Sequence, residues 1–155
     1  MTTELTTFET GDVLSYEVRI AAPPDVVWTF WVDPERMARW MGDRATLEPR
    51  PGGTFRLEYG SGDVAAGAFV ELDAPHHLVF TWGWEADGDP VPAGASRIEV
   101  SLEAVDGGAA TLRRLRHLGL PPESRAGHDE GWRYFLPRLV DAGAEAAPGS
   151  EQPQK

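Results

Sequence analysis

Between residues 45 and 118 the sequence consists of six short strand-like segments joined by turn-forming residues. The segments are rich in apolar residues, often in alternation, and Gly, Pro, Ser and Asp residues bound them, as is typical of β-strands. No helical segment lies between them, so parallel crossover connections are not available and an antiparallel meander is expected. The predicted strands are 45–48, 54–59, 64–72, 77–84, 96–104 and 110–118.

A further strand and two short helices are predicted before this meander. Residues 13–20 alternate between apolar and polar side chains, which indicates a strand with one buried face. Prolines at positions 23 and 24 suit a first helical turn, and Val27, Trp28 and Trp31 follow at helical spacing. Asp33 is a candidate N-cap for a second short helix, which Gly42 ends.

The last element is predicted to be a long helix from Ser124, acting as N-cap, to about Ala142. Its apolar stripe recurs at positions three and four apart. Gly127 and Gly131 lie one turn apart, and we expect them to allow close approach to the sheet. Pro137 removes one backbone donor, so a kink is expected there. The stripe consists of His128, Trp132, Phe135, Leu136, Leu139 and Val140.

Length and composition indicate a single globular domain. The chain has 155 residues, six Trp, no Cys and a formal net charge of −11. We expect a flexible N-terminal tail over residues 1–11, one domain over 12–142 and a disordered C-terminal tail over 143–155. The acidic excess argues against nucleic acid and membrane surfaces as partners. The chain starts without a basic flank or an apolar run, so a cytoplasmic protein is expected.

Several sequence blocks together resemble the family of domains homologous to the activator of the Hsp90 ATPase. The resemblance spans residues 13–142 and implies an α+β helix-grip fold of the START-like or Bet v 1-like (SRPBCC) superfamily. In that fold a curved antiparallel sheet of about seven strands wraps around the C-terminal helix, two short helices follow strand 1, and a cavity lies between sheet and helix. The blocks are 20–28, Trp40, 51–55, 67–75, 78–82, 111–117, 119–121, Gly131 with Trp132, Leu136 and Leu139.

The resemblance implies function less specifically than fold, because related domains include lipid and hormone carriers, polyketide cyclases and stress-associated proteins. We expect a binding protein for a small hydrophobic, apolar or aromatic ligand. One alternative is an enzyme of the polyketide cyclase or aromatase type on the same scaffold. A second alternative is a chaperone-associated stress-response interaction module. Co-chaperone members carry an additional N-terminal domain, and about eleven residues precede the first predicted strand here, so Hsp90 is not expected as a partner. A homodimer stays open.

Ten residues are candidates for the ligand cavity. The aromatic ones would line it and the polar ones would orient a ligand. The strand at 110–118 leaves the position of Arg113 open: it points into the cavity, or it joins Arg114 and Arg116 in an outer ladder with Glu99 and Glu103. The candidates are Trp28, Trp40, Phe55, Tyr59, Trp82, Trp84, Arg113, His117, His128 and Trp132.

No catalytic or metal site is predicted. The sequence lacks a Gly-x-Ser-x-Gly elbow and any metal-ligand spacing of histidines, and no cofactor is expected. Charge is unevenly distributed, with a net −9 over residues 58–106 and +3 in each of the stretches 36–57 and 107–140. If the two basic stretches meet at the cavity mouth, their arginines would favour an anionic ligand.

Overall fold

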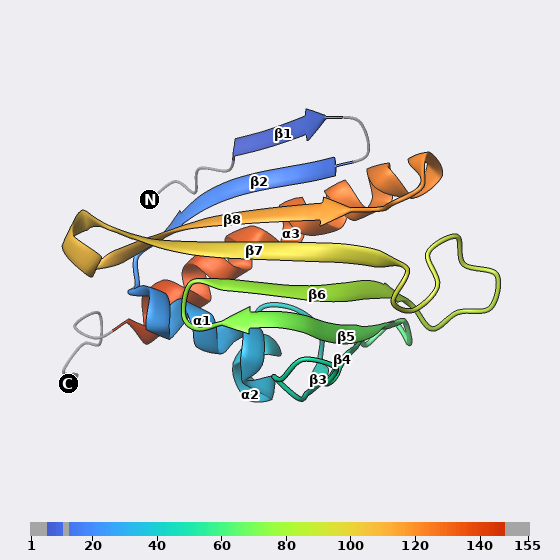
Figure 1. The fold of residues 1–155 in the computed structure, drawn as a ribbon, viewed down its shortest axis with the longest axis horizontal. Helices are drawn as coiled ribbons and strands as arrows, with labels where there is room; N and C mark the ends of the chain where they lie inside the picture. Colours follow the sequence, from blue (N-terminus) through green and yellow to red (C-terminus); the bar gives the residue numbers. More distant parts are fainter. Residues whose placement is uncertain (1–5, 11–12, 148–155) are drawn as a thin grey trace.

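The protein folds as a curved antiparallel sheet that wraps around one long helix (Figure 1). This computed structural model describes the backbone of residues 6–10 and all of residues 13–147. The strand order is β1-β2-β8-β7-β6-β5-β4-β3. The strands are β1 (Thr6–Thr10), β2 (Val13–Ile20), β3 (Arg44–Leu47), β4 (Thr54–Glu58), β5 (Val64–Asp73), β6 (His77–Trp84), β7 (Ser96–Val105) and β8 (Ala110–Leu118).

The sheet order confirms the predicted meander. Strands β3 to β8 pair with their neighbours in sequence, and β2 joins the sheet by pairing with β8. All seven predicted strands are present, with ends within one residue of those expected. Turn-forming residues located the ends of these strands, and alternation identified the buried side of those with one covered face, such as β2 and β4.

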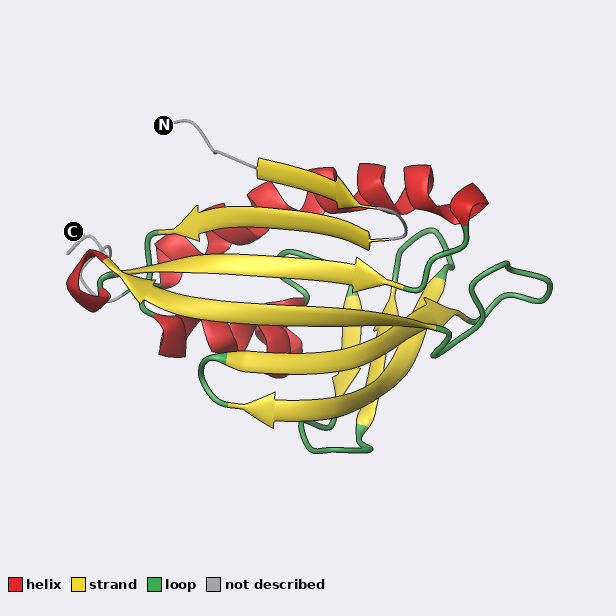
Figure 2. Ribbon diagram, turned by 45° about the horizontal axis from the view of Figure 1, so that its top comes forward, coloured by secondary structure: helices red, strands yellow, loops and turns green. Residues whose placement is uncertain are grey.

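The helices confirm the helix-grip fold. They are α1 (Pro24–Val32), α2 (Pro34–Met37) and α3 (Pro122–Ala146), with a short 3-10 turn η1 (Asp106–Gly108) between β7 and β8. The Asp33 side chain accepts a hydrogen bond from the Glu35 amide, as expected for the N-cap of α2. Figure 2 shows α3 running along one face of the sheet. No helix of residues 13–147 is long and apolar enough to cross a membrane.

Both ends of the domain extend further than predicted. Residues 1–11 were expected to form a tail, whereas Thr6–Thr10 form β1 and pair with β2. An edge strand can form through backbone hydrogen bonds and the β-propensity of threonine alone, without the alternating apolar residues by which the other strands were recognised. Helix α3 ends at Ala146, beyond the expected boundary at 142. The predicted tail residues 1–5, 11–12 and 148–155 lie outside the described residues.

Helix α3 begins earlier than predicted. It begins at Pro122 with Pro121 as N-cap, so Ser124 is not the cap. Proline suits the first helical position because its missing N–H has no acceptor there in any case. The helix continues through Pro137, the position of the expected kink. Packing of the apolar stripe against the sheet outweighs the loss of one hydrogen bond.

Strand β8 settles the orientation of Arg113. The side chains of Thr111, Arg113, Leu115 and His117 face the interior and are fully buried. Arg113 pairs in register with Val18 of β2 and Leu102 of β7. The outer face carries Arg114, which contacts Glu17 and Glu103, and Arg116, which contacts Glu99. The expected outer ladder therefore forms without Arg113.

Aromatic side chains from α1, from the segment after α2, and from β4 and β6 fill part of the interior between the sheet and the helices. Phe55 stacks on Phe80 with ring centroids 4.1 Å apart. Trp31 meets Trp40 edge-on at 4.9 Å, and the Trp40 indole donates to the Phe30 carbonyl. These four rings are fully buried in the core.

Candidate ligand-binding pocket

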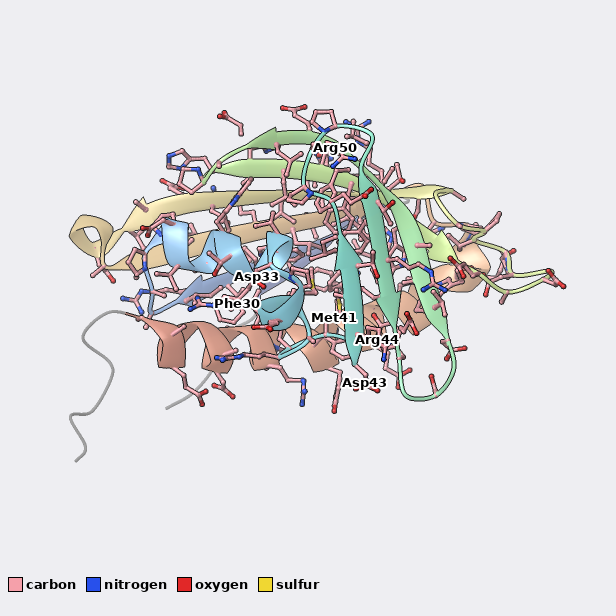
Figure 3. All side chains as sticks on the ribbon, turned by 90° about the horizontal axis from the view of Figure 1, so that it is seen from below. Phe30, Asp33, Met41, Asp43, Arg44 and Arg50 are labelled. Carbon is pink, nitrogen blue, oxygen red and sulfur yellow. The ribbon has the colours of Figure 1, made fainter. Side chains whose placement is uncertain are left out.

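A pocket of about 500 Å³ lies between the N-terminal half of α3 and one end of the sheet. Strand β6 forms its floor, and the β4–β5 turn and the β6–β7 loop form its rim. Met41, in the segment between α2 and β3, adds to the wall (Figure 3). In Figures 1 and 2 the first turns of α3 and the β6–β7 loop lie at the same end of the molecule. The lining includes six aromatic side chains: Tyr59, Trp82, Trp84, His128, Trp132 and Phe135.

Two rows of residues on α3 face the pocket. One row is Glu123, Gly127, Gly131 and Phe135, and the other is Ser124, His128 and Trp132. Each row has a spacing of four, so its members lie one above the other on the helix surface. The pocket is therefore positioned by the same periodicity that predicted the apolar stripe.

The glycines of α3 open the pocket rather than bringing the helix close to the sheet. A Cβ atom added at Gly127 or Gly131 would meet nothing within 4 Å. The prediction of close approach at these positions is therefore wrong. Close approach occurs instead at Gly143, where an added Cβ would lie 2.7 Å from Ile20.

The aromatic rings of the pocket form one connected group. Trp82 meets Trp84 edge-on, with centroids 5.5 Å apart, and lies 6.0 Å from Trp132. Tyr59 lies 5.9 Å from both Trp84 and Phe135, so it links the floor to the helix. Rings held by several neighbours make rigid apolar walls at this spacing.

Hydrogen bonds fix the orientation of Trp84 and His128. The Trp84 indole donates to Nε2 of His128 over 3.0 Å. Nδ1 of His128 lies 2.8 Å from the Ser124 carbonyl, which can only accept, so the ring proton is on Nδ1. Both ring nitrogens of His128 are therefore occupied by protein groups.

His117 is the centre of a second chain of hydrogen bonds just behind the pocket wall. The Trp132 indole donates to Nδ1 of His117 over 3.0 Å. Nε2 then carries the proton and donates to the Ser96 hydroxyl at 2.8 Å, which in turn donates to the Trp82 carbonyl at 2.7 Å. This neutral imidazole ties Trp132 of α3 to Trp82 of β6.

Burial, with a smaller contribution from His128, holds the pKa of His117 well below its ordinary value of 6.5. Below pH 6.5, His117 is therefore protonated in the unfolded chain but stays neutral in the folded protein. The contribution of neutral His117 to the free energy of unfolding should be fully present above this pH. As the pH decreases below it, the free energy of unfolding should fall by up to about 1.4 kcal/mol per pH unit. Urea unfolding at several pH values between 5 and 7.5 measures this slope.

The variant His117→Gln should show a smaller slope by about one proton over this range. His77→Gln, which removes a half-exposed histidine beside Glu71, is the matched control with which this slope is compared. An unchanged slope in His117→Gln would show that His117 is not the group responsible.

Charged side chains at the rim are acidic. Asp63, Asp89 and Glu123 line the pocket, and no Arg or Lys does so among the described residues. The expectation that arginines of 36–57 and 107–140 meet at the mouth is therefore not met. The arginines of β8 instead point to the outer face or, for Arg113, into the core.

The phenol of Tyr59 is the polar group best placed to meet a ligand. It is largely buried in the pocket wall and makes no hydrogen bond within residues 13–147. Burial, and secondarily the charge of Asp63, raises the pKa of Tyr59. The hydroxyl therefore stays protonated and can donate to an acceptor.

The ten candidate residues fall into three groups. Tyr59, Trp82, Trp84, His128 and Trp132 line the pocket. His117 lies behind it and holds Trp132. Trp28, Trp40, Phe55 and Arg113 are not in the lining: Trp28 packs against the core, and the other three are fully buried in it.

Sequence reasoning missed most of the rim. Asp63, Asp89 and Glu123 come from two turns and a helix start, and only the assembled fold brings them together. Phe135 was part of the predicted apolar stripe, and its spacing of seven from His128 could have identified it. No three His, Asp or Glu side chains of the described chain gather as a metal site would require.

Comparison with known proteins places this geometry in a family. The structure resembles CalU16 from Micromonospora echinospora, at 25% identity over 92% of this chain and 85% of that one, with a TM-score of 0.68. DynU16, described as a protein of the dynemicin biosynthetic locus, is also 25% identical. It has a TM-score of 0.73, and the match covers 92% of this chain and about half (51%) of DynU16.

A third similar structure is PFC0360w, an HSP90 activator from Plasmodium falciparum. It is 23% identical over 83% of this chain and 94% of that one, with a TM-score of 0.70, and this likeness concerns the fold alone. No curated protein matches the chain. The model of the family described as Activator of Hsp90 ATPase homolog 1-like protein matches residues 21–143. The chain therefore belongs to this family.

Proposed function

We propose that the protein binds an apolar small molecule with an aromatic part in the pocket between the sheet and α3. The observation that carries the proposal is the aromatic-lined cavity of about 500 Å³. This volume is in the range of known small-molecule sites, which combine apolar walls with few polar groups. The free hydroxyl of Tyr59 provides such a polar group.

The proposal is confined to binding because the histidines are not free to act as acid or base. Both ring nitrogens of His117 and His128 are engaged by protein groups. A general acid or base has to reach the reacting proton directly or through one water. The cyclase alternative therefore lacks support from these two residues, and Arg113 has no access to the pocket.

The relatives give the proposal additional support. DynU16 is described as a protein of a biosynthetic locus, which is compatible with a small-molecule role. The family name refers to Hsp90, but the neighbour described as an Hsp90 activator is similar only at the level of the fold. We therefore base the proposal on the pocket and not on the family name.

The six tryptophans offer a direct test by NMR. Trp82, Trp84 and Trp132 line the pocket, whereas Trp28, Trp31 and Trp40 do not. Titration with the neutral aromatic probe N-phenylnaphthylamine should shift the indole N–H signals of the first three and leave those of the other three in place. Single Trp→Phe variants assign the signals.

The three remaining tryptophans serve as internal controls in the same sample. Equal shifts of all six signals would indicate a global change, and shifts confined to Trp28, Trp31 and Trp40 would place the site elsewhere. If the probe causes no shift up to its solubility limit, and native mass spectrometry of the freshly purified protein shows no bound small molecule, the proposed function is wrong.

A further inference from the structure

Three carboxylates from separate parts of the chain surround the mouth of the pocket. Asp63 lies in the β4–β5 turn, Asp89 in the β6–β7 loop and Glu123 in the first turn of α3. They lie beside an aromatic cavity that is a candidate site on independent grounds. No basic side chain lines that cavity within the described residues.

None of these three carboxylates belongs to an ion pair of the described chain. Asp63 accepts from the Ser61 hydroxyl, and Asp89 accepts from the Val91 amide. By contrast, carboxylates on the outer face of the sheet are matched with arginines, such as Glu17 and Glu103 with Arg114. The negative charge at the mouth is therefore not neutralised by the protein.

The walls next to these carboxylates also suit a cation. The rings of Tyr59, Trp84 and Phe135 lie close together and line the pocket near its rim. Aromatic faces attract cations through their electron-rich π systems, and the effect grows where water is excluded. The pKa of Tyr59 is raised mainly by burial and secondarily by the charge of Asp63, and this second contribution agrees with a negative potential here.

We propose that the pocket selects a ligand with a cationic group, such as a protonated amine attached to an apolar aromatic body. The amine lies at the mouth among Asp63, Asp89 and Glu123, and the aromatic body lies against Trp82 and Trp132. This inference rests on the proposed function and narrows its ligand class. It replaces the anionic ligand expected from the sequence.

Three probes of nearly equal shape test the charge preference. Naphthylmethylamine is protonated at neutral pH, naphthylmethanol is neutral and naphthoate is anionic, and isothermal titration calorimetry measures the affinity of each. At low ionic strength the amine should bind about tenfold more tightly than the alcohol, and naphthoate most weakly. The advantage of the amine should shrink in about 0.5 M sodium chloride, because exposed charges are screened.

A triple variant locates the charge effect. In Asp63→Asn/Asp89→Asn/Glu123→Gln the amine should bind within about twofold of the alcohol, while affinity for the alcohol is retained. The matched control Glu35→Gln/Glu130→Gln/Asp141→Asn removes the same net charge at exposed positions outside the pocket. It should keep the preference for the amine. Circular dichroism and thermal unfolding verify that both variants are folded.

The outcomes separate this inference from the proposed function. If the alcohol or naphthoate binds as tightly as the amine, or if the control variant loses the preference as fully as the rim variant, the cationic ligand is refuted while the pocket remains a binding site. If none of the three probes binds, the proposed function fails and this inference fails with it.

Discussion

Replacing Arg113 by methionine is expected to raise the free energy of unfolding by about 1–4 kcal/mol. The guanidinium is fully buried, and none of its three nitrogens has a hydrogen-bond partner among the described residues. Burial lowers the pKa of Arg113 to about 9, an effect that Glu17 partly opposes, so the side chain stays charged at neutral pH. An unpaired charge in an apolar interior is costly, and methionine fills a similar length without it.

Urea unfolding of Arg113→Met and of a matched control measures this effect. The control Arg116→Met removes an arginine three residues further along the same strand, on the outer face, where it contacts Glu99. Loss of an exposed ion pair should change the free energy of unfolding by less than about 1 kcal/mol. A destabilised Arg113→Met variant would contradict the prediction, because it would mean that the guanidinium is stabilised by a bound group in solution.

Filling the pocket from α3 should abolish binding while making the protein more stable. In the variant Gly127→Leu/Gly131→Leu both new side chains enter open space of the cavity. We expect affinity for N-phenylnaphthylamine to fall at least about tenfold, since apolar contact area is lost to the leucines. The free energy of unfolding should rise by about 1–2 kcal/mol, because glycine is unfavourable inside a helix.

The opposite signs of the two effects exclude unfolding as the cause of lost binding. Ala126→Leu/Glu130→Leu is the matched control, since it places the same side chains one residue earlier, at exposed positions outside the pocket. It should bind the probe like the wild type. Undiminished binding by the glycine variant would show that the ligand does not occupy this cavity.

The fold was predictable because its information is local. Short apolar segments bounded by turn-forming residues located all seven expected strands, and the stripe on residues 128–140 located α3. The orientation of Arg113 was not predictable, because both faces of β8 carry leucine and arginine. It is decided by the register with Leu102 on the preceding strand and with Val18, which lies far away in sequence.

The pocket was only partly predictable for a related reason. A cavity is the space that side chains leave empty, and this depends on which rings fill the interior first. Phe55 and Trp40 are of the same residue types as the aromatic residues of the pocket. They nevertheless lie in the core, where Phe55 packs on Phe80 and Trp40 packs on Trp31. The sequence shows which aromatic residues are present, whereas their packing in the folded protein determines where a cavity is left.

Helix α3 divides its tasks along its length. Its second half is packed tightly, with Leu136 and Leu139 fully buried and Gly143 pressed against Ile20. Its first half borders the pocket, and Gly127 and Gly131 contact little there. Substitutions at Gly127, Gly131 and the exposed positions of the first half therefore alter the shape and charge of the site without disturbing the core. This separation favours the evolution of new ligand preferences, because most substitutions that change the pocket leave the packing of the core unchanged.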